Sequence, residues 1–266
     1  MNAKKIMQMR KSVQNLKVIA NIKLNSDHHL LHLKVPEKIE SINPGQFANI
    51  LVDQSQSVFL RRPFSIHAVD YPNNSISILI KEIGEGTRSL SNTAVDSLLS
   101  VIFPLGNGFT LPVSKNRVLL VGGGCGVAPL MYLAQSLNKV HSEVHILLGA
   151  RSATDLVELD QYSLYGRLYT TTEDGSHGEK GYVTDHSLFG KLAQFTQIYC
   201  CGPEPMMKAV AARAKSNNVA CEVSLENTMA CGFGVCLCCV TETTLGHKCV
   251  CTDGPVFNTN QLKWQI

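Results

Sequence analysis

Apolar and polar residues alternate in short runs along the first third of the chain. The members of two such runs are Leu31, Leu33 and Val35, and then Ile76, Ile78 and Ile80. A period of two is typical of strands with one buried face. The runs are separated by the turn sequences Pro44-Gly45, Pro72-Asn73-Asn74 and Gly84-Glu85-Gly86. Short alternating strands with frequent turns predict a small antiparallel β-barrel.

From Val118 onward the pattern changes to buried strands that alternate with helices. Predicted strands cover 118–121, 144–148 and 197–201, and glycine-rich turns follow the first and the third. Two predicted helices have apolar residues at helical spacing: Leu130, Leu133, Ala134 and Leu137 in one, and Met206, Met207, Val210, Ala211 and Ala214 in the other. This alternation predicts a parallel sheet with crossover helices.

Length and composition fit two domains and a small appendix. The chain has 266 residues, of which 44% are hydrophobic and 17% charged, so it can bury real cores. The net charge is +3, but the first 17 residues hold five basic groups and no acid, which leaves a nearly neutral body. Such a body lacks the basic surface that nucleic-acid binding requires.

Targeting signals are not expected either. Lys and Arg interrupt the N-terminal segment before an apolar signal core can form. The long uncharged stretch 118–134 contains four glycines and a proline, which argues against a membrane-spanning helix. We therefore expect a soluble, cytoplasmic protein with no membrane or nucleic-acid partner.

The cysteines carry the most specific chemical signal. Six of the ten lie between Cys231 and Cys251. Cys231, Cys236 and Cys239 have the spacing C-x4-C-x2-C, and a distant fourth cysteine follows, which is the plant-type [2Fe–2S] arrangement. Gly232 and Gly234 allow the loop to curl around a cluster.

Spacing leaves two questions open at this site. The fourth ligand is either Cys249 or Cys251, while Cys238 lies between two proposed ligands and is expected to point away from them. A zinc site is the alternative, although structural zinc favours paired C-x2-C units and the first spacing here is four.

Two glycine turns predict a nucleotide site in the middle of the chain. The segment Gly122-Gly-Gly-Cys-Gly-Val-Ala-Pro129 follows a strand, where backbone N–H groups can approach a pyrophosphate. A tight structural turn is the alternative, because Val127 replaces the third glycine of the usual motif. The turn Cys201-Gly202-Pro203 would lie at the same edge of the sheet, which strengthens the nucleotide interpretation.

The predicted barrel contains a segment suited to a planar ring and a phosphate. In Arg61-Arg62-Pro63-Phe64-Ser65, Phe64 can pack on a ring, Ser65 can bond its edge and Arg62 can take the charge. A surface charge beside a core ring is the alternative. Gly84-Glu-Gly-Thr87 is either a pyrophosphate cradle or a plain hairpin loop.

Taken together, these motifs resemble the ferredoxin–NADP reductase superfamily. Pro44-Gly-Gln-Phe47, Arg62–Ser65, Gly86-Thr87, the 122–129 turn and the 201–203 turn stand in the same order as in that superfamily. The tail, Met229-Ala-Cys-Gly-Phe-Gly-Val-Cys-Leu-Cys-Cys239 with Cys251-Thr-Asp-Gly-Pro-Val-Phe257, is similar to the electron-transfer subunits of NAD-linked (type B) dihydroorotate dehydrogenases, the PyrK family. The resemblance covers the chain from about Val18 onward.

This resemblance implies an α+β fold in three parts. An FAD-binding antiparallel β-barrel would occupy residues 1–112, with a basic leader over 1–16 that we expect to be a frayed tail. An NAD-binding α/β domain with a parallel sheet would occupy 113–222, and a small [2Fe–2S] domain 223–266.

The resemblance also implies which residues bind the cofactors. The expected FAD residues are Arg62, Pro63, Phe64, Ser65, Leu79, Ile80, Lys81, Gly86 and Thr87. The expected cluster ligands are Cys231, Cys236, Cys239 and Cys251, since the family's last cysteine directly precedes the x-Asp-Gly-Pro-Val-Phe string. The expected NAD residues are Gly122, Gly123, Gly124, Gly126, Cys201, Gly202 and Pro203. Phe64 departs from the tyrosine common in the superfamily, and Arg151-Ser152 leaves NAD and NADP both open.

The implied function is electron transfer in pyrimidine (UMP) synthesis. An FMN-containing catalytic subunit (PyrD type) would oxidise dihydroorotate, and electrons would pass through the [2Fe–2S] cluster and FAD to NAD+, since a flavin exchanges both single electrons and hydride. No catalytic residue for dihydroorotate is expected in this chain, and the assembly is expected to be a heterotetramer with two of each subunit. The alternatives are a subunit of a sulfide dehydrogenase or ferredoxin–NADP transhydrogenase, or a non-catalytic zinc or redox-sensing module.

Overall fold

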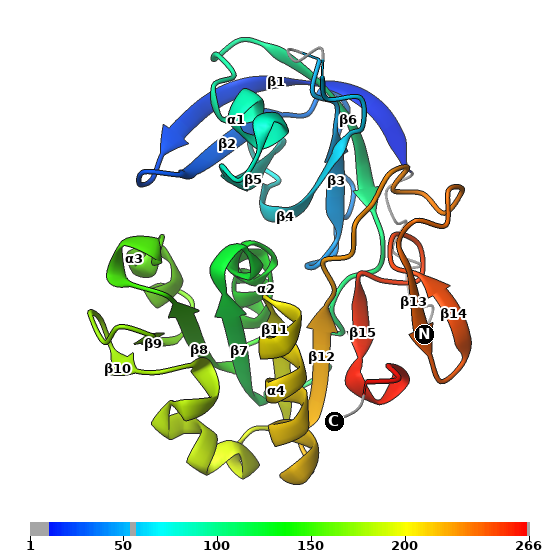
Figure 1. The fold of residues 1–266 in the computed structure, drawn as a ribbon. Coiled ribbons are helices and arrows are strands. Elements are labelled where there is room, and N and C mark those ends of the chain that lie inside the picture. Colours follow the sequence, from blue (N-terminus) through cyan, green and yellow to red (C-terminus); the bar gives the residue numbers. More distant parts are fainter. Residues whose placement is uncertain (1–10, 54–56, 265–266) are drawn as a thin grey trace.

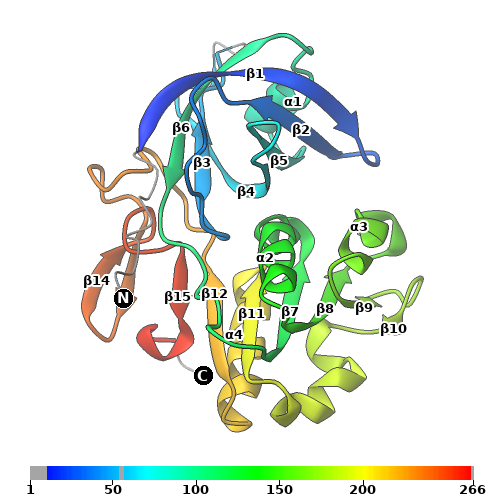
Figure 2. The same cartoon turned by 180° about the vertical axis from the view of Figure 1, so that it is seen from behind.

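The computed structural model describes residues 11–53 and 57–264. Figure 1 shows the barrel above a mostly parallel sheet with helices, and a C-terminal segment beside both. Figure 2 shows from behind that the same segment runs alongside the strands at one side of the barrel. The three-part α+β fold expected from the sequence is thereby confirmed.

Six antiparallel strands close the barrel in the order β1-β2-β5-β4-β3-β6. Their bounds are β1 (Ser12–Lys23), β2 (His28–Lys34), β3 (Phe47–Ile50), β4 (Arg62–Asp70), β5 (Ser75–Lys81) and β6 (Leu98–Leu105), and helix α1 (Glu85–Ser91) joins β5 to β6. The alternating residues Leu31, Leu33, Ile76, Ile78 and Ile80 are at most 1% exposed. The residues at the predicted period of two therefore form part of the barrel core, although the alternate positions of β5 from Ser75 to Leu79 are buried as well.

Strand β1 corrects the predicted extent of the basic leader over residues 1–16. It begins at Ser12 and pairs with β6 as far as Lys17 and with β2 beyond that point. Leu16 is fully buried and Gln14 is only 7% exposed. Pairing with β6 thus makes 12–16 part of the barrel, whereas residues 1–10 lie outside the described residues.

The second part is a seven-stranded sheet in the order β10-β9-β8-β7-β11-β12-β15. The bounds are β7 (Arg117–Gly123), β8 (Glu143–Ala150), β9 (Arg167–Thr172), β10 (Glu179–Lys180), β11 (Gln197–Cys201), β12 (Ala220–Ser224) and β15 (Val256–Asn258). All neighbouring strands are parallel except β12 and β15. The three strands predicted from the sequence lie within β7, β8 and β11.

Helices cover this sheet. They are α2 (Ala128–Lys139), α3 (Leu159–Ser163) and α4 (Glu204–Ser216), with 3-10 turns η1 (Gly124–Val127), η2 (Ala153–Asp155), η3 (Val183–Asp185), η4 (Ser187–Gln194) and η5 (Thr259–Gln261). Leu130, Leu133, Ala134 and Leu137 of α2 are fully buried, as their spacing predicts. Within the described ranges, none of the helices combines the length and apolar character needed to cross a membrane.

The C-terminal segment is not a separate layer. A hairpin of β13 (Val240–Thr243) and β14 (Gly246–Cys249) precedes β15, which pairs antiparallel with β12 of the central sheet. The domain boundary predicted between residues 222 and 223 falls inside β12. The end of the chain therefore contributes to the nucleotide domain as well as to the cluster segment.

Buried polar contacts hold the barrel against the sheet. His67 of β4 lies with Nδ1 2.8 Å from the Ala128 carbonyl oxygen and with Nε2 2.9 Å from Oε2 of Glu158. The hydroxyl of Tyr132 in α2 donates to the carbonyl of Ile42 at 2.9 Å. Strand β4 is thereby fixed over the start of α2, so the barrel motif faces the carboxyl ends of the parallel strands.

Candidate functional site

The residues predicted to bind FAD surround a place where two barrel strands separate. The ladder between β4 and β5 runs from Ile66–Ile78 to Asp70–Ser75. Residues 62–65 pair with β3, and residues 79–81 pair with β2. Segments 62–65 and 79–81 therefore have no ladder between them. The backbone groups on their facing edges can form hydrogen bonds to a ligand.

Arg62 and Gly86 meet at one end of this separation. A Cβ atom on Gly86 would lie 3.1 Å from Nε of Arg62, so the guanidinium packs directly on the glycine turn. The neighbouring Arg61 has a different role, because its Nη1 and Nη2 donate to the Ser100 carbonyl (2.7 Å) and hydroxyl (2.9 Å). Arg62, whose Nη1 donates to the Leu60 carbonyl at 2.8 Å, is therefore the arginine that lies beside the predicted pyrophosphate turn.

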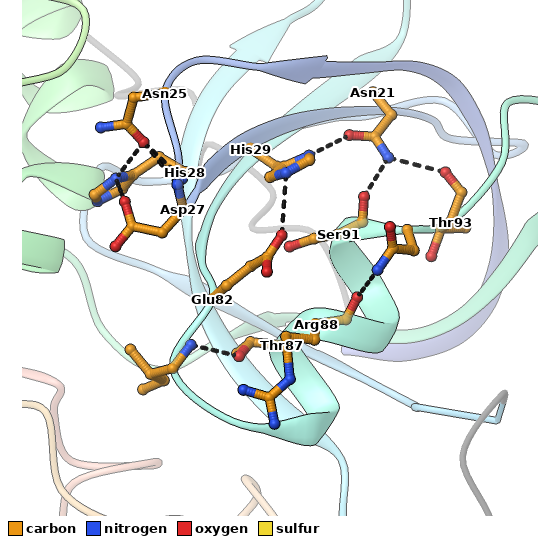
Figure 3. Close-up of polar contacts among 12 residues, drawn as sticks. Asn21, Asn25, Asp27, His28, His29, Glu82, Thr87, Arg88, Ser91 and Thr93 are labelled. Carbon is orange, nitrogen blue, oxygen red and sulfur yellow. Dashed lines mark hydrogen bonds and ion pairs between the residues drawn. The ribbon is translucent and has the colours of Figure 1, made fainter.

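The hydroxyl of Thr87 shapes the turn that carries Gly86. Its Oγ1 accepts hydrogen bonds from the backbone N–H of Ile83 (2.9 Å) and Gly84 (3.0 Å) and donates to the Gly84 carbonyl at 2.9 Å. Figure 3 shows Thr87 at this end of α1. Because the hydroxyl is already occupied, Thr87 would contribute to the predicted pyrophosphate cradle mainly by fixing its backbone.

A polar network fixes α1 to the barrel (Figure 3). Asn21 of β1 donates to the carbonyls of Ser91 (2.8 Å) and Thr93 (2.9 Å) beyond the end of the helix. The Oδ1 atom of Asn21 lies 3.2 Å from Nδ1 of His29, whose Nε2 lies 3.2 Å from a carboxylate oxygen of Glu82. Helix α1 and the turn before it are thus anchored to β1 and β2.

The other predicted FAD residues differ in what they expose. Phe64 is half-buried and packs against the barrel core, and Ser65 is also half-buried. Leu79 and Ile80 are buried in two different cores, so they can reach a cofactor only through their backbone. The side chain of Lys81 instead enters the nucleotide cavity described below.

The two glycine turns of the nucleotide domain touch each other. Strands β7 and β11 are parallel neighbours, with Gly122 opposite Cys201. A Cβ atom on Gly126 would lie 2.3 Å from the carbonyl carbon of Cys201 and 2.4 Å from the backbone nitrogen of Gly202. No side chain fits there, so the predicted convergence of the turns on one sheet edge is built into the backbone.

A cavity of about 690 Å³ opens along this edge. Gly123, Gly124, Gly149, Arg151, Pro203 and Met206 line it from the sheet, and Lys81 and Ile83 line it from the barrel. Four of the predicted NAD residues do not line the cavity: Gly122, Gly126, Cys201 and Gly202. They form the contact between the two turns instead. The cavity therefore lies between the predicted FAD and NAD residues, as hydride transfer between the two requires.

Acidic residues balance the cations in this cavity. Asp155 and Glu173 line it together with Lys81 and Arg151. The ammonium of Lys81 lies 3.8 Å from Asp155 Oδ1 and 3.5 Å from Asp27 Oδ2. Asp155 and Glu173 were not predicted from the sequence, although both follow the carboxyl ends of strands, which is the position that marks ligand contacts in such sheets.

A carboxyl group lies beside the buried Cys201. The thiol of Cys201 is 3.6 Å from Oε1 of Glu226, whose side chain is exposed. Burial raises the pKa of the Cys201 thiol, and desolvation raises the pKa of the Glu226 carboxyl group. Cys201 is 1% exposed, so it would contribute to the predicted nucleotide site through its backbone. Glu226 was not predicted, since a single glutamate after a strand gives no distinct signal.

The cluster loop, residues 231–239, carries the first three predicted ligands. It curls because two of its residues adopt backbone angles that favour glycine. The φ angle is 81° at Gly232 and 90° at Gly234. A Cβ atom on Gly234 would lie 2.8 Å from Cγ2 of Thr252, in the segment that carries Cys251. The glycines thus bring the first part of the loop close to its last cysteine.

Backbone N–H groups converge on the first predicted ligand. Those of Phe233, Val235 and Cys236 lie 3.4–3.5 Å from the sulfur of Cys231. Burial alone would raise the pKa of Cys231, but these N–H groups and the Cys236 thiol lower it to about 6. The loop thereby stabilises a thiolate, which is the form that binds iron.

The four predicted ligands form two pairs. Cys236 lies beside Cys231, and the buried Cys251 donates its backbone N–H to the sulfur of Cys239 at 3.4 Å. Burial and the adjacent Cys239 raise the pKa of Cys251 to about 12. In the part of the chain that is described, no three potential ligands converge on one point. Two pairs suit a cluster of two irons better than a single tetrahedral zinc ion.

The remaining cysteines of the segment are placed differently. The thiol of Cys238 points to the Thr228 carbonyl at 3.6 Å, away from the ligands as expected. Cys249 ends β14, and its backbone N–H donates to the carboxylate of Asp253 at 3.0 Å. Cys251 is thus the buried partner of Cys239, whereas Cys249 is half-buried at the side.

Two family models match the chain. The iron–sulfur cluster binding domain of dihydroorotate dehydrogenase B matches residues 226–263. The oxidoreductase NAD-binding domain matches residues 120–212. The two matches coincide with the cluster segment and with the sheet that carries the glycine turns.

Curated relatives are similar over most of the chain. The dihydroorotate dehydrogenase B (NAD(+)) electron transfer subunit of Shouchella clausii is 35% identical over 260 residues, which are 96% of this chain and 99% of the relative. The protein of the same name from Caldanaerobacter subterraneus subsp. tengcongensis is 41% identical over 219 residues, which are 81% of this chain and 85% of the relative.

Solved structures share the fold. The structure of an NADH-dependent reduced ferredoxin-NADP oxidoreductase superposes with a TM-score of 0.82 and 29% identity over 95% of this chain and 91% of the other. A ferredoxin reductase in carbazole 1,9a-dioxygenase gives a TM-score of 0.70 at 23% identity, covering 79% of this chain and 67% of the other, which shows the fold alone.

Proposed function

The chain belongs to the family of dihydroorotate dehydrogenase B electron transfer subunits, and on this premise we propose that it transfers electrons from a catalytic partner to NAD+ in pyrimidine synthesis. One observation carries the proposal. The four predicted cysteine ligands form two pairs, and the N–H groups of the cluster loop face Cys231. This loop belongs to the same chain as a nucleotide cavity at the barrel.

The residues present fit three redox groups. FAD would be held by Arg62–Ser65, Leu79–Lys81 and the Gly86-Thr87 turn, where two strand edges and a guanidinium face one another. NAD would lie on the two glycine turns, and the cluster on Cys231, Cys236, Cys239 and Cys251. When bound, FAD supplies exchange of hydride on one side and of single electrons on the other.

The charge in the cavity supports NAD as the nucleotide. Lys81 and Arg151 are opposed by Asp155 and Glu173 in the same cavity. Two cations can balance the two phosphates of a dinucleotide, whereas the two carboxylates disfavour the additional negative charge of a 2′-phosphate. Arg151 alone therefore does not make the site one for NADP.

The partner would be an FMN-containing subunit that oxidises dihydroorotate, in a cytoplasmic heterotetramer with two copies of each chain. The base that acts on dihydroorotate would belong to that partner. Phe233, Val235 and Leu237 of the cluster loop support a contact there, because their apolar side chains are 46–73% exposed. Electrons could then enter this chain next to the cluster ligands.

Stopped-flow reduction tests this division of roles. Dihydroorotate should reduce the flavin and cluster of this chain in the presence of the catalytic partner and leave both oxidised in its absence. Reduction of the isolated chain by dihydroorotate would show the division to be wrong. Reduction only by NADPH or reduced ferredoxin would instead favour the transhydrogenase alternative. The alternative is tested because the chain is similar to the NADH-dependent reduced ferredoxin-NADP oxidoreductase.

A further inference from the structure

One buried side chain connects the barrel to the cluster loop. Asn49 of β3 is fully buried, and its Nδ2 donates to the carbonyl oxygen of Cys231 at 3.0 Å. The two residues are 182 positions apart in the sequence. Figures 1 and 2 both show the segment after β12 running along the strands at this side of the barrel. A predicted ligand is therefore fixed by a side chain from the flavin-binding part.

The loop is shaped to receive this amide. A Cβ atom on Gly232 would lie 2.6 Å from Nδ2 of Asn49 and 3.3 Å from its Cγ. The φ angle of 81° at Gly232 is one that side chains rarely adopt. Any other residue at this position would both strain the loop and displace the asparagine.

The backbone of Asn49 belongs to the barrel. It pairs with Pro63 across β3 and β4, and the neighbouring pair is Ala48 with Phe64. The Asn49 carbonyl also accepts from Nη1 of Arg61 at 3.3 Å. Asn49 is thus one strand away from the segment 62–65, the segment proposed to hold the flavin, and one hydrogen bond away from a cluster ligand.

The side chain retains an unused acceptor. Oδ1 of Asn49 is buried and has no hydrogen-bond partner among residues 11–53 and 57–264. A buried amide oxygen normally has a donor, and the protein around it supplies none. Because the protein itself covers this side chain completely, the oxygen does not face the cofactor site, and Asn49 acts through the bond from Nδ2.

We propose that Asn49 is the positioning residue that couples the cluster to the flavin, with Nδ2 holding Cys231 and its backbone paired with Pro63 in the segment proposed to hold FAD. This inference rests on the proposed function, because it assumes that both groups bind. Asn49 takes no proton and forms no covalent bond. It sets the separation of the two redox centres and links them through hydrogen bonds, and small displacements strongly affect reactions that depend on such positioning.

The test is anaerobic reduction of the loaded complex by NADH in the wild type and in Asn49→Leu, which keeps the volume and removes the side-chain hydrogen bond to Cys231. Flavin reduction should keep its rate, whereas the subsequent cluster reduction should slow by roughly tenfold or more. The magnetic interaction between the reduced cluster and the one-electron-reduced flavin, measured by EPR, should weaken. Asn49→His, which keeps an N–H donor near the position of Nδ2, should restore much of both signals.

Asn107→Leu is the matched control. The amide of Asn107 also joins the barrel side to the cluster segment, with bonds of 3.0 Å to the carbonyls of Thr252 and Asp253, but it lies outside the strand next to 62–65. It should leave the rate of cluster reduction unchanged. An equal slowing in this variant, or wild-type rate and EPR interaction in Asn49→Leu, overturns the inference.

Two further readouts separate the possible failures. Iron and FAD contents report whether Asn49→Leu still loads its cofactors. If it does not, Asn49→Ser is compared instead, since its hydroxyl is too short to reach the Cys231 carbonyl. Wild-type kinetics in a loaded Asn49→Ser overturn the inference as well. A wild-type chain without FAD, iron or NADH-dependent cluster reduction contradicts the proposed function itself.

Discussion

Single residues decide which thiols in the cluster segment bind iron. Cys251 is fully buried against Cys239, while Cys249 lies two residues earlier at the end of β14 and is bonded to Asp253 through its backbone. We expect Cys251→Ser to lose most of the bound iron, because each iron needs both thiolates of its pair. Cys249→Ser should keep the wild-type iron content. Iron analysis and the visible spectrum of the purified proteins measure both.

The same comparison also tests the zinc alternative. Retention of iron in Cys251→Ser together with its loss in Cys249→Ser would exchange the roles of the two cysteines. Stoichiometric zinc in place of iron, in protein purified without oxygen, would contradict the cluster assignment altogether.

Glu226 should give the folded chain a pH dependence of its own. The side chain of Glu226 is exposed, but desolvation of its carboxyl group raises the pKa above the ordinary value of 4.5, and the Cys201 thiol partly opposes this. The folded state therefore holds this proton more tightly than the unfolded state. Its contribution to stability is complete below pH 4.5 and is lost as the pH rises through the raised pKa.

Glu226→Gln removes this loss, since an amide does not ionise. The difference in Tm between Glu226→Gln and the wild type should grow in favour of the variant as the pH is raised from about 5 to about 8. Glu204→Gln, at an exposed position of α4, is the control and should shift Tm equally at all pH values. Parallel profiles for Glu226→Gln and wild type would show that the carboxyl group is ionised in the fold.

At the scale of elements, the contact between the turns after β7 and β11 defines the nucleotide site. A methyl group on Gly126 would collide with the backbone of Cys201 and Gly202 at 2.3–2.4 Å. Neither backbone can move without shifting a strand end, so Gly126→Ala should weaken NADH binding and cost about 1–3 kcal/mol of stability. Fluorescence titration with NADH and urea unfolding measure the two effects.

Gly190→Ala is the matched control for this change. A Cβ atom at Gly190, in η4, would meet no atom within 4 Å. It should leave NADH affinity and the urea midpoint close to wild type. Wild-type NADH affinity in Gly126→Ala would mean that close contact between the two turns is not needed for NADH binding.

Elements with a strong local pattern could be predicted from the sequence. The apolar run 118–121 and the alternation at Ile76, Ile78 and Ile80 identified β7 and β5, because both patterns are local in the sequence. The structure buries both faces of β5, since the alternate residues Ser75, Ser77 and Leu79 are also covered. Strand β9 was missed, since Tyr169 and three threonines gave no apolar run. Strand β1 was partly assigned to a leader because its exposed face carries lysines, and only pairing with β6 shows that Leu16 is buried.

In the candidate site, too, residues in a local sequence pattern could be predicted, whereas residues that act through tertiary contacts could not. Cysteine spacing and glycine turns are local, so the loop around Cys231 and the turn at Gly126 could be recognised before the fold was known. Asn49 and Glu226 act through contacts across domains, with Cys231 and Cys201 respectively. A lone asparagine in a short strand carries no pattern of its own, so its role follows only from the tertiary structure.

At the scale of the whole molecule, the proposed sites form a continuous series. The nucleotide cavity reaches Lys81 at the barrel, the separated ends of β4 and β5 come next, and Asn49 leads to the cluster loop. The loop then ends the series at the surface, with Val235 and Leu237 exposed. A chain that relays electrons needs one end open to a soluble nucleotide and the other to a protein partner.

The exposed part of the cluster loop has the features of a docking surface. Phe233 and Val235 are 46% and 73% exposed, and Leu237 is 63% exposed. Leu237 also has a φ of 58°, a left-handed conformation that costs a non-glycine residue roughly 1–2 kcal/mol. Strain and apolar exposure at one loop are typical of interaction sites. We therefore expect the catalytic partner to cover this loop.

Replacing both Phe233 and Val235 by serine tests that expectation. Burial of such side chains contributes about 1.5–3 kcal/mol each, so the Kd for the partner should rise at least roughly tenfold. Iron content should stay unchanged, because these residues reach Cys231 only through their backbone N–H groups. Val113→Ser, at a fully exposed position between β6 and β7, is the control and should bind normally. Unaltered partner binding by the double variant, with iron retained, would place the interface elsewhere on the chain and require electrons to enter by a different route.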